Sequence, residues 1–68
     1  MTNTKLLREK IEASGLKLSY IADQLGISGK ALSMKIENRT EFKPSEIVKL
    51  SELLRIKSAE ERTQIFLI

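Results

Sequence analysis

The stretch from Leu18 to Ser28, which runs LSYIADQLGIS, decides the fold of this chain. Its apolar residues recur every three or four positions, as on one buried stripe of a short helix: Leu18, Ile21, Ala22 and Leu25. Gly26 follows directly and can adopt the positive φ of a tight turn. Ser28 then offers a side-chain oxygen as the N-cap of the next helix. The stretch therefore predicts two short helices that cross steeply around a glycine-containing turn.

A first helix is expected ahead of this pair, over about residues 4–14. Asn3 or Thr4 provides the N-cap, and Leu7 and Ile11 lie one helical turn apart. Gly15 stands where a glycine commonly ends a helix. The amphipathic pattern predicts that this helix packs on the pair.

The helix that begins after Ser28 is expected to bury Leu32 and Ile36. Residues 38–43 then form a loop, in which Asn38 tolerates the left-handed conformation. Phe42 is the apolar side chain expected to pin this loop to the core. The loop thus separates the third helix from a fourth.

Two further helices are expected in the last third of the chain. Pro44 suits the first position of a helix that runs to about Arg55, with an apolar face of Ile47, Leu50, Leu53 and Leu54. Ser58 and Glu61 have the spacing of a capping box, so a fifth helix begins there. Its terminal cluster, Ile65 to Ile68, is expected to close the core against the first helix, with a dimer contact as the alternative.

The fold class predicted from these patterns is all-α, a bundle of five short helices in a single domain over residues 1–68. The chain has no cysteine and no histidine, so neither a disulfide nor a zinc site is expected to stabilise it. No stretch has the length and apolarity of a membrane span or a signal peptide. We therefore expect a soluble, cytoplasmic protein.

Charge and motif content favour binding over catalysis. Twelve Lys and Arg oppose nine Asp and Glu, and the stretch from Ser28 to Lys43 is the most basic, with four basic residues and two acidic ones. Such an excess suits an anionic partner. No nucleophile and base pair, phosphate-binding loop or dinucleotide motif is present, so an enzyme, a cofactor, a metal and a small-molecule ligand are not expected.

The stretch from Leu18 to Ser28 resembles the helix-turn-helix of the lambda-repressor and Cro superfamily. The alanine and glycine of that motif match Ala22 and Gly26, and the resemblance continues through Lys35 to Asn38 and Phe42 to Leu54. The short length resembles Cro-like or repressor-like regulators of phages and prophages. The resemblance implies a sequence-specific regulator of transcription in a bacterial host, bound to a double-stranded DNA operator, with the third helix in the major groove. It is compatible with a homodimer on DNA.

The residues expected to face DNA follow from this placement. Candidates for base contact are Ser28, Gly29, Lys30, Ser33 and Met34. Candidates for phosphate contact are Lys17, Ser19, Tyr20, Lys35, Asn38, Arg39 and Lys43. The basic residues could instead form an ordinary solvated surface, and Met34 could pack rather than touch a base. For Tyr20, covering the edge of the core is slightly favoured over phosphate contact.

Two positions depart from the family pattern. Arg39 stands where a glycine commonly follows the Glu-Asn pair, and Gly29 stands where the family often has a base-reading glutamine or arginine. We therefore expect few direct contacts to bases, so that sequence specificity depends largely on DNA shape. Gly29 also favours the rival hypothesis, a protein-interaction module such as a repressor modulator or an antitoxin, with DNA binding lost or secondary.

Overall fold

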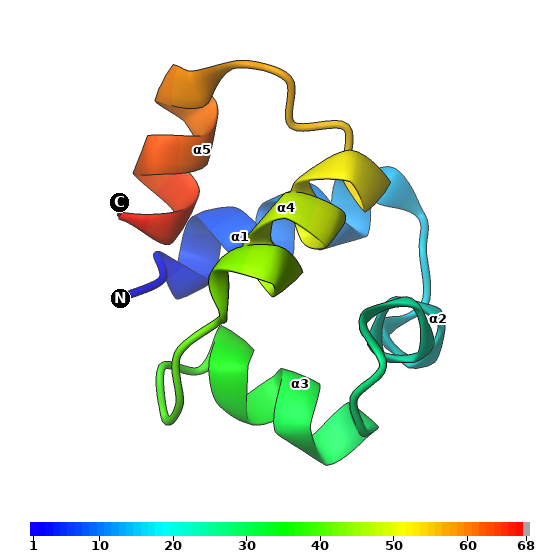
Figure 1. Ribbon diagram of the computed structural model, residues 1–68. Coiled ribbons are helices and arrows are strands. Elements are labelled where there is room, and N and C mark those ends of the chain that lie inside the picture. Colours follow the sequence, from blue (N-terminus) through cyan, green and yellow to red (C-terminus); the bar gives the residue numbers. More distant parts are fainter. Residues whose placement is uncertain (68) are drawn as a thin grey trace.

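The computed structural model describes residues 1–67 as five helices and no strand (Figure 1). The helices are α1 (Thr4–Ser14), α2 (Leu18–Leu25), α3 (Gly29–Ile36), α4 (Pro44–Leu53) and α5 (Ala59–Phe66). They form one globule of 28 × 24 × 21 Å, in which α2 packs on both α3 and α4, and α1 contacts α3 and α5. The predicted all-α class with five short helices is confirmed. None of these helices is long and apolar enough to cross a membrane.

The predicted ends of the first three helices are confirmed by their capping contacts. Asn3 caps α1, because its Oδ1 accepts a hydrogen bond from the Leu6 amide at 3.1 Å. Gly15 and Gly26 end α1 and α2 with φ values of 73° and 72°. Ser28 caps α3 through its Oγ, which accepts from the Ala31 amide at 3.0 Å. Local chemistry therefore sets these boundaries.

The fourth helix ends earlier than predicted, at Leu53 rather than near Arg55. Arg55 adopts φ 58°, the left-handed region, and its N–H donates to the Glu52 carbonyl at 3.2 Å. The next amide, of Ile56, donates back to the Ser51 carbonyl at 2.9 Å. This pair of bonds is a Schellman closure, usually made by glycine. It turns the chain so that Ile56 enters the core, where it is 4% exposed.

The predicted capping box at the start of α5 is only half formed. Ser58 Oγ accepts from the Glu61 amide at 3.0 Å, so the helix begins where the motif places it. The Glu61 carboxylate, however, accepts from Lys10 Nζ at 3.1 Å. Within residues 1–67 it makes no return bond to the Ser58 amide, because it joins α5 to α1 instead.

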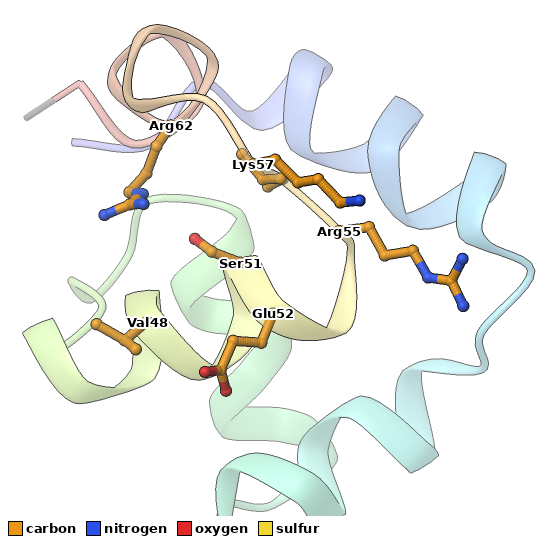
Figure 2. A pocket seen from close by; sticks show the side chains of 7 residues that line it. Val48, Ser51, Glu52, Arg55, Lys57 and Arg62 are labelled. Atoms are coloured by element: carbon orange, nitrogen blue, oxygen red, sulfur yellow. The ribbon is translucent and has the colours of Figure 1, made fainter.

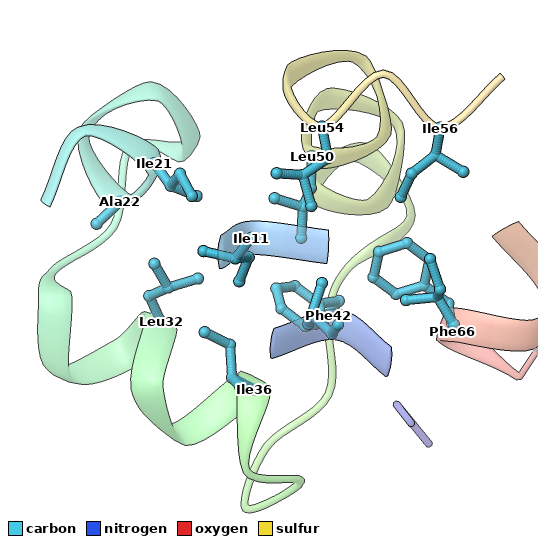
Figure 3. Packing of buried hydrophobic residues seen from close by; sticks show 12 residues of the cluster. Ile11, Ile21, Ala22, Leu32, Ile36, Phe42, Leu50, Leu54, Ile56 and Phe66 are labelled. Carbon is cyan, nitrogen blue, oxygen red and sulfur yellow. The ribbon is translucent and has the colours of Figure 1, made fainter. Parts of the chain in front are cut away.

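The core draws side chains from all five helices and from both loops that flank α4 (Figure 3). Phe42 anchors the loop after α3 as predicted, and its ring meets that of Phe66 edge to face, with centroids 5.7 Å apart. Ile65 and Phe66 are buried, which confirms that they close the core. Leu67 is exposed, and Ile68 lies outside the described residues.

One residue of the predicted apolar stripe on α2 lies outside this core. Ile21 and Ala22 are buried and Leu25 is partly buried, but Leu18 is 40% exposed. Leu18 is the first residue of its helix, where no earlier turn of α2 can cover it. The stripe therefore begins at Ile21.

Candidate nucleic-acid interface

Two backbone hydrogen bonds close the C-terminal end of α2 before the turn into α3. The Gly26 amide donates to the Asp23 carbonyl, and the Ile27 amide donates to the Ala22 carbonyl, both at 3.0 Å. Ala22 is 3% exposed, so its small side chain is enclosed where α2 packs on its neighbours. A larger residue there would push the helices apart.

The base-contact candidates lie on the solvent side of α3, opposite its buried residues. Leu32 and Ile36 are each 1% exposed and fix the inner face of the helix. Lys30 and Ser33 are exposed one turn apart, and Met34 beside them is partly buried. Ser28 and Gly29 are exposed at the N-terminal end of the same helix. Four of the five candidates are thus exposed on α3 or at its start, and Met34 is partly buried.

Gly29 is not required by packing within the protein. A Cβ atom built at this position meets nothing within 4 Å, and the backbone φ is not in the left-handed region. A side chain could therefore stand there without strain. The glycine either leaves room for something outside the chain or has no role in the fold.

Lys17, Ser19 and Tyr20 are exposed around the N-terminus of α2. Lys17 is the N-cap residue but makes no side-chain capping bond, and the first turn contains no acidic residue. A helix start of this kind attracts anions through its free amides. Tyr20 is 46% exposed, which is compatible both with partial cover of the core edge by its ring and with a phosphate contact by its hydroxyl.

Lys35 differs from the expectation of an open phosphate contact. Its Nζ donates to Glu46 Oε1 at 2.9 Å and to the Glu41 carbonyl at 3.0 Å. Only 12% of the Lys35 side chain and 9% of the Glu46 side chain are exposed. The ammonium group therefore joins α3 to the start of α4 within the protein, and we leave it out of the interface.

The side chain of Asn38 is also engaged within the chain. Its φ is 65°, which confirms the predicted left-handed conformation. Its Oδ1 accepts from the Thr2 amide at 2.7 Å, and its Nδ2 donates to the Thr2 carbonyl at 2.6 Å. This two-bond clasp holds the N-terminal segment, so the amide group is not free to face a phosphate.

Of the basic candidates, Lys17, Lys30, Arg39 and Lys43 are exposed. Arg39 is 73% exposed and lies 3.8 Å from Glu37, which also pairs with Arg8 at 3.2 Å. Exposed pairs of this kind contribute little and exchange readily. The four cations can thus contact an external polyanion without breaking a buried interaction.

Glu46 is the polar residue of this region that the sequence analysis did not single out. Burial raises the pKa of its carboxyl, but hydrogen bonds from the Lys43 amide, at 2.8 Å, and from the Lys35 ammonium group outweigh burial and hold that pKa below its ordinary value. The signal was present, because Glu46 stands three residues after the N-cap Lys43, the position of the glutamate in a capping box.

Comparison with protein-family models, with curated proteins and with solved structures gives no match.

Proposed function

We propose that this chain is a sequence-specific double-stranded DNA-binding regulator of transcription, with α2 and α3 as a helix-turn-helix and α3 as the recognition helix. The observation that carries the proposal is the solvent face of α3. Lys30 and Ser33 stand exposed there, on a helix held against α2 by a three-residue turn, with Lys17, Arg39 and Lys43 around it. The resemblance to Cro-like and repressor-like regulators supports a phage or prophage protein acting in the bacterial cytoplasm.

The dimensions of α3 suit the major groove. With its side chains an α-helix is about 10–12 Å across, which fits the roughly 12 Å width of the major groove in B-DNA. Lys30 can donate to guanine, Ser33 can bond to several bases, and Met34 can contact a thymine methyl. Lys17, at the start of α2, then approaches the phosphate backbone, as the first helix of such a pair does.

A single module of this size buries little DNA surface, so we propose that two copies bind together. A two-fold pair places its recognition helices in successive major grooves, about 34 Å apart. The operator would then be an inverted repeat with half-sites one helical turn apart.

The first test is affinity selection of random duplex DNA on the purified protein at about 150 mM salt, where non-specific binding is weak. The proposal expects one motif to be enriched. Lys30→Glu should then lower affinity for that motif at least tenfold. Lys57→Glu is the matched control, because it reverses an exposed lysine between α4 and α5, and it should change affinity less than twofold. No enrichment, or equal effects of the two variants, would contradict the proposal.

Salt dependence provides an independent test. Three phosphate contacts, by Lys17, Arg39 and Lys43, predict that log affinity falls with log salt at a slope of about −2.7 per protomer. A slope near zero would mean that these cations do not meet phosphates.

The second candidate function is protein interaction, as in a repressor modulator or an antitoxin. Leu18 and Tyr20 are 40% and 46% exposed near the start of α2, and Gly29 leaves the start of α3 without a side chain. Exposed apolar residues favour a protein partner. Leu18→Asp would abolish partner binding while sparing DNA binding at low salt, whereas Lys30→Glu would do the reverse.

A further inference from the structure

The structure contains a groove between α4 and α5 that the proposed DNA surface does not use. Its volume is about 480 Å³, within the range of small-molecule sites. Figure 1 shows α3 and α5 at opposite ends of the molecule, so this groove and the recognition helix are separate surfaces. Val48 and Ile56 supply its apolar lining, and Ser51 and Arg62 supply polar groups.

Two polar atoms in this groove are buried and unpaired. Among residues 1–67, Ser51 Oγ and Arg62 Nε have no hydrogen-bond partner. Ser51 as a whole is 5% exposed. Figure 2 shows the Ser51 side chain pointing from α4 toward α5, and the Arg62 side chain reaching from α5 into the same space. Buried polar groups are nearly always paired, so these two atoms beside one groove leave hydrogen-bonding capacity for an external group.

The chemistry of these two groups selects a carboxylate. Arg62 can present Nε–H and a neighbouring Nη–H as a planar fork, which matches the two oxygens of a carboxylate. Ser51 Oγ–H adds a third donor. A neutral amide offers one acceptor oxygen only and would leave part of the fork unpaired.

The surrounding charges favour a single negative charge over two. Arg55 and Lys57 also line the groove, but Figure 2 shows both side chains extending away from Ser51 and Arg62. Glu52 brings a carboxylate to the lining. One guanidinium group therefore faces the ligand, which suits a monoanion better than a phosphate dianion. Val48, 54% exposed, provides an apolar surface for a short hydrocarbon chain.

We propose that the groove between α4 and α5 binds a small organic carboxylate, with the carboxylate on Arg62 and Ser51 and an apolar body along Val48. The site is independent of the proposed DNA binding, since it shares no residue with that surface.

The test is an NMR titration of the ¹⁵N-labelled protein with hexanoate, and with hexanamide as the uncharged match. Hexanoate should give saturable shifts at the Ser51 and Arg62 amides and at the Arg62 Nε–H, with a dissociation constant of about 1 mM for a ligand of this size. Hexanamide should bind at least tenfold more weakly. Equal binding of hexanoate and hexanamide would overturn the proposal, and so would a hexanoate titration that does not saturate at about twentyfold the expected dissociation constant.

Variants and a second anion complete the test. Ser51→Ala and Arg62→Gln should each weaken hexanoate binding at least tenfold, and Ser51→Ala removes an unpaired hydroxyl, so it should still fold. Arg8→Gln, which removes an exposed arginine outside the groove, should leave binding unchanged. An equal loss in Arg8→Gln would mean non-specific attraction. Inorganic phosphate binding as tightly as hexanoate would show a general anion site and overturn the choice of carboxylate.

Discussion

Replacing Glu46 by glutamine removes the negative member of the ion pair that joins α3 to α4. Glu46 Oε1 accepts from both Lys35 Nζ, at 2.9 Å, and the Lys43 amide, at 2.8 Å. In Glu46→Gln the amide oxygen can still accept from Lys43, but the Lys35 ammonium group is left without a counter-charge at 12% exposure. Breaking a buried pair in this way costs about 3–5 kcal/mol.

We expect the lower end, about 3 kcal/mol, because Lys35 keeps its bond to the Glu41 carbonyl. A chain of 68 residues has a total stability of about 3–10 kcal/mol, so this loss is a large share. It corresponds to a fall in Tm of at least about 12 °C. Urea unfolding at pH 7, followed by circular dichroism, measures it.

A double variant separates the lost pair from the lost packing. Lys35→Met with Glu46→Gln removes both charges while the new amide oxygen can still accept from the Lys43 amide, and it should recover stability to within about 1 kcal/mol of the parent. A loss below about 1 kcal/mol in Glu46→Gln, the range of exposed pairs, would refute the reasoning. A stable Lys35→Met variant with weakened DNA binding would return Lys35 to the interface.

Three other predictions follow from features near α3. The pKa of the Glu46 carboxyl is lower in the folded chain than its ordinary 4.5, so the ionised carboxylate stabilises the fold fully above that value, and this stabilisation is lost as pH falls through the folded pKa. Urea unfolding midpoints measured between pH 7 and pH 3 should show the loss, and Glu46→Gln should lack this pH-dependent part of the stability. Gly29→Ala should raise stability by about 0.5 kcal/mol in thermal unfolding, since its Cβ meets nothing; a lower Tm would contradict the open geometry. Asn38→Gly should lower stability by about 2 kcal/mol, because it removes the two bonds to Thr2. Asn38→Ala should cost about 1 kcal/mol more, because alanine is strained in the left-handed conformation. Equal losses of the two variants in urea unfolding would count against this strain.

The elements with local signals were predictable from the sequence. Gly15 and Gly26 ended helices in the expected left-handed conformation, and Ser28 capped α3. Each of these features depends on residues within one helical turn. The spacing of Ile21 and Ala22 likewise placed them in the core, because helical periodicity alone selects a buried face.

Features that depend on tertiary contacts were not predictable in this way. Lys35 carried a charge in the basic stretch, and only the approach of α4 shows that Glu46 neutralises it. Asn38 lies 36 positions from Thr2, so its clasp has no local signature. Arg55 ends α4 in a conformation that usually calls for glycine, because burial of Ile56 draws the chain into the core.

The distinction between local signals and tertiary contacts also applies to the two candidate sites. The shared exposed face of Lys30 and Ser33 followed from helical geometry, so the sequence was sufficient to place both side chains on the solvent side of α3; that this face reads DNA stays a prediction. The groove holding Ser51 and Arg62 had no signal in the sequence, because it exists only where α5 folds back over α4.

The first residues of the chain are tied into the fold at two distant points. The Asn3 amide donates to the Ile65 carbonyl at 2.7 Å, and the Thr2 amide donates to Asn38. Terminal amides usually exchange with deuterium almost at once, because chain ends fray. Here the Asn3 proton can exchange only when α5 separates from α1, and the Thr2 proton only when the end of α3 releases its clasp. The exchange rate of the Asn3 amide therefore reports the separation of α5 from α1, and the exchange rate of the Thr2 amide reports the opening at the end of α3.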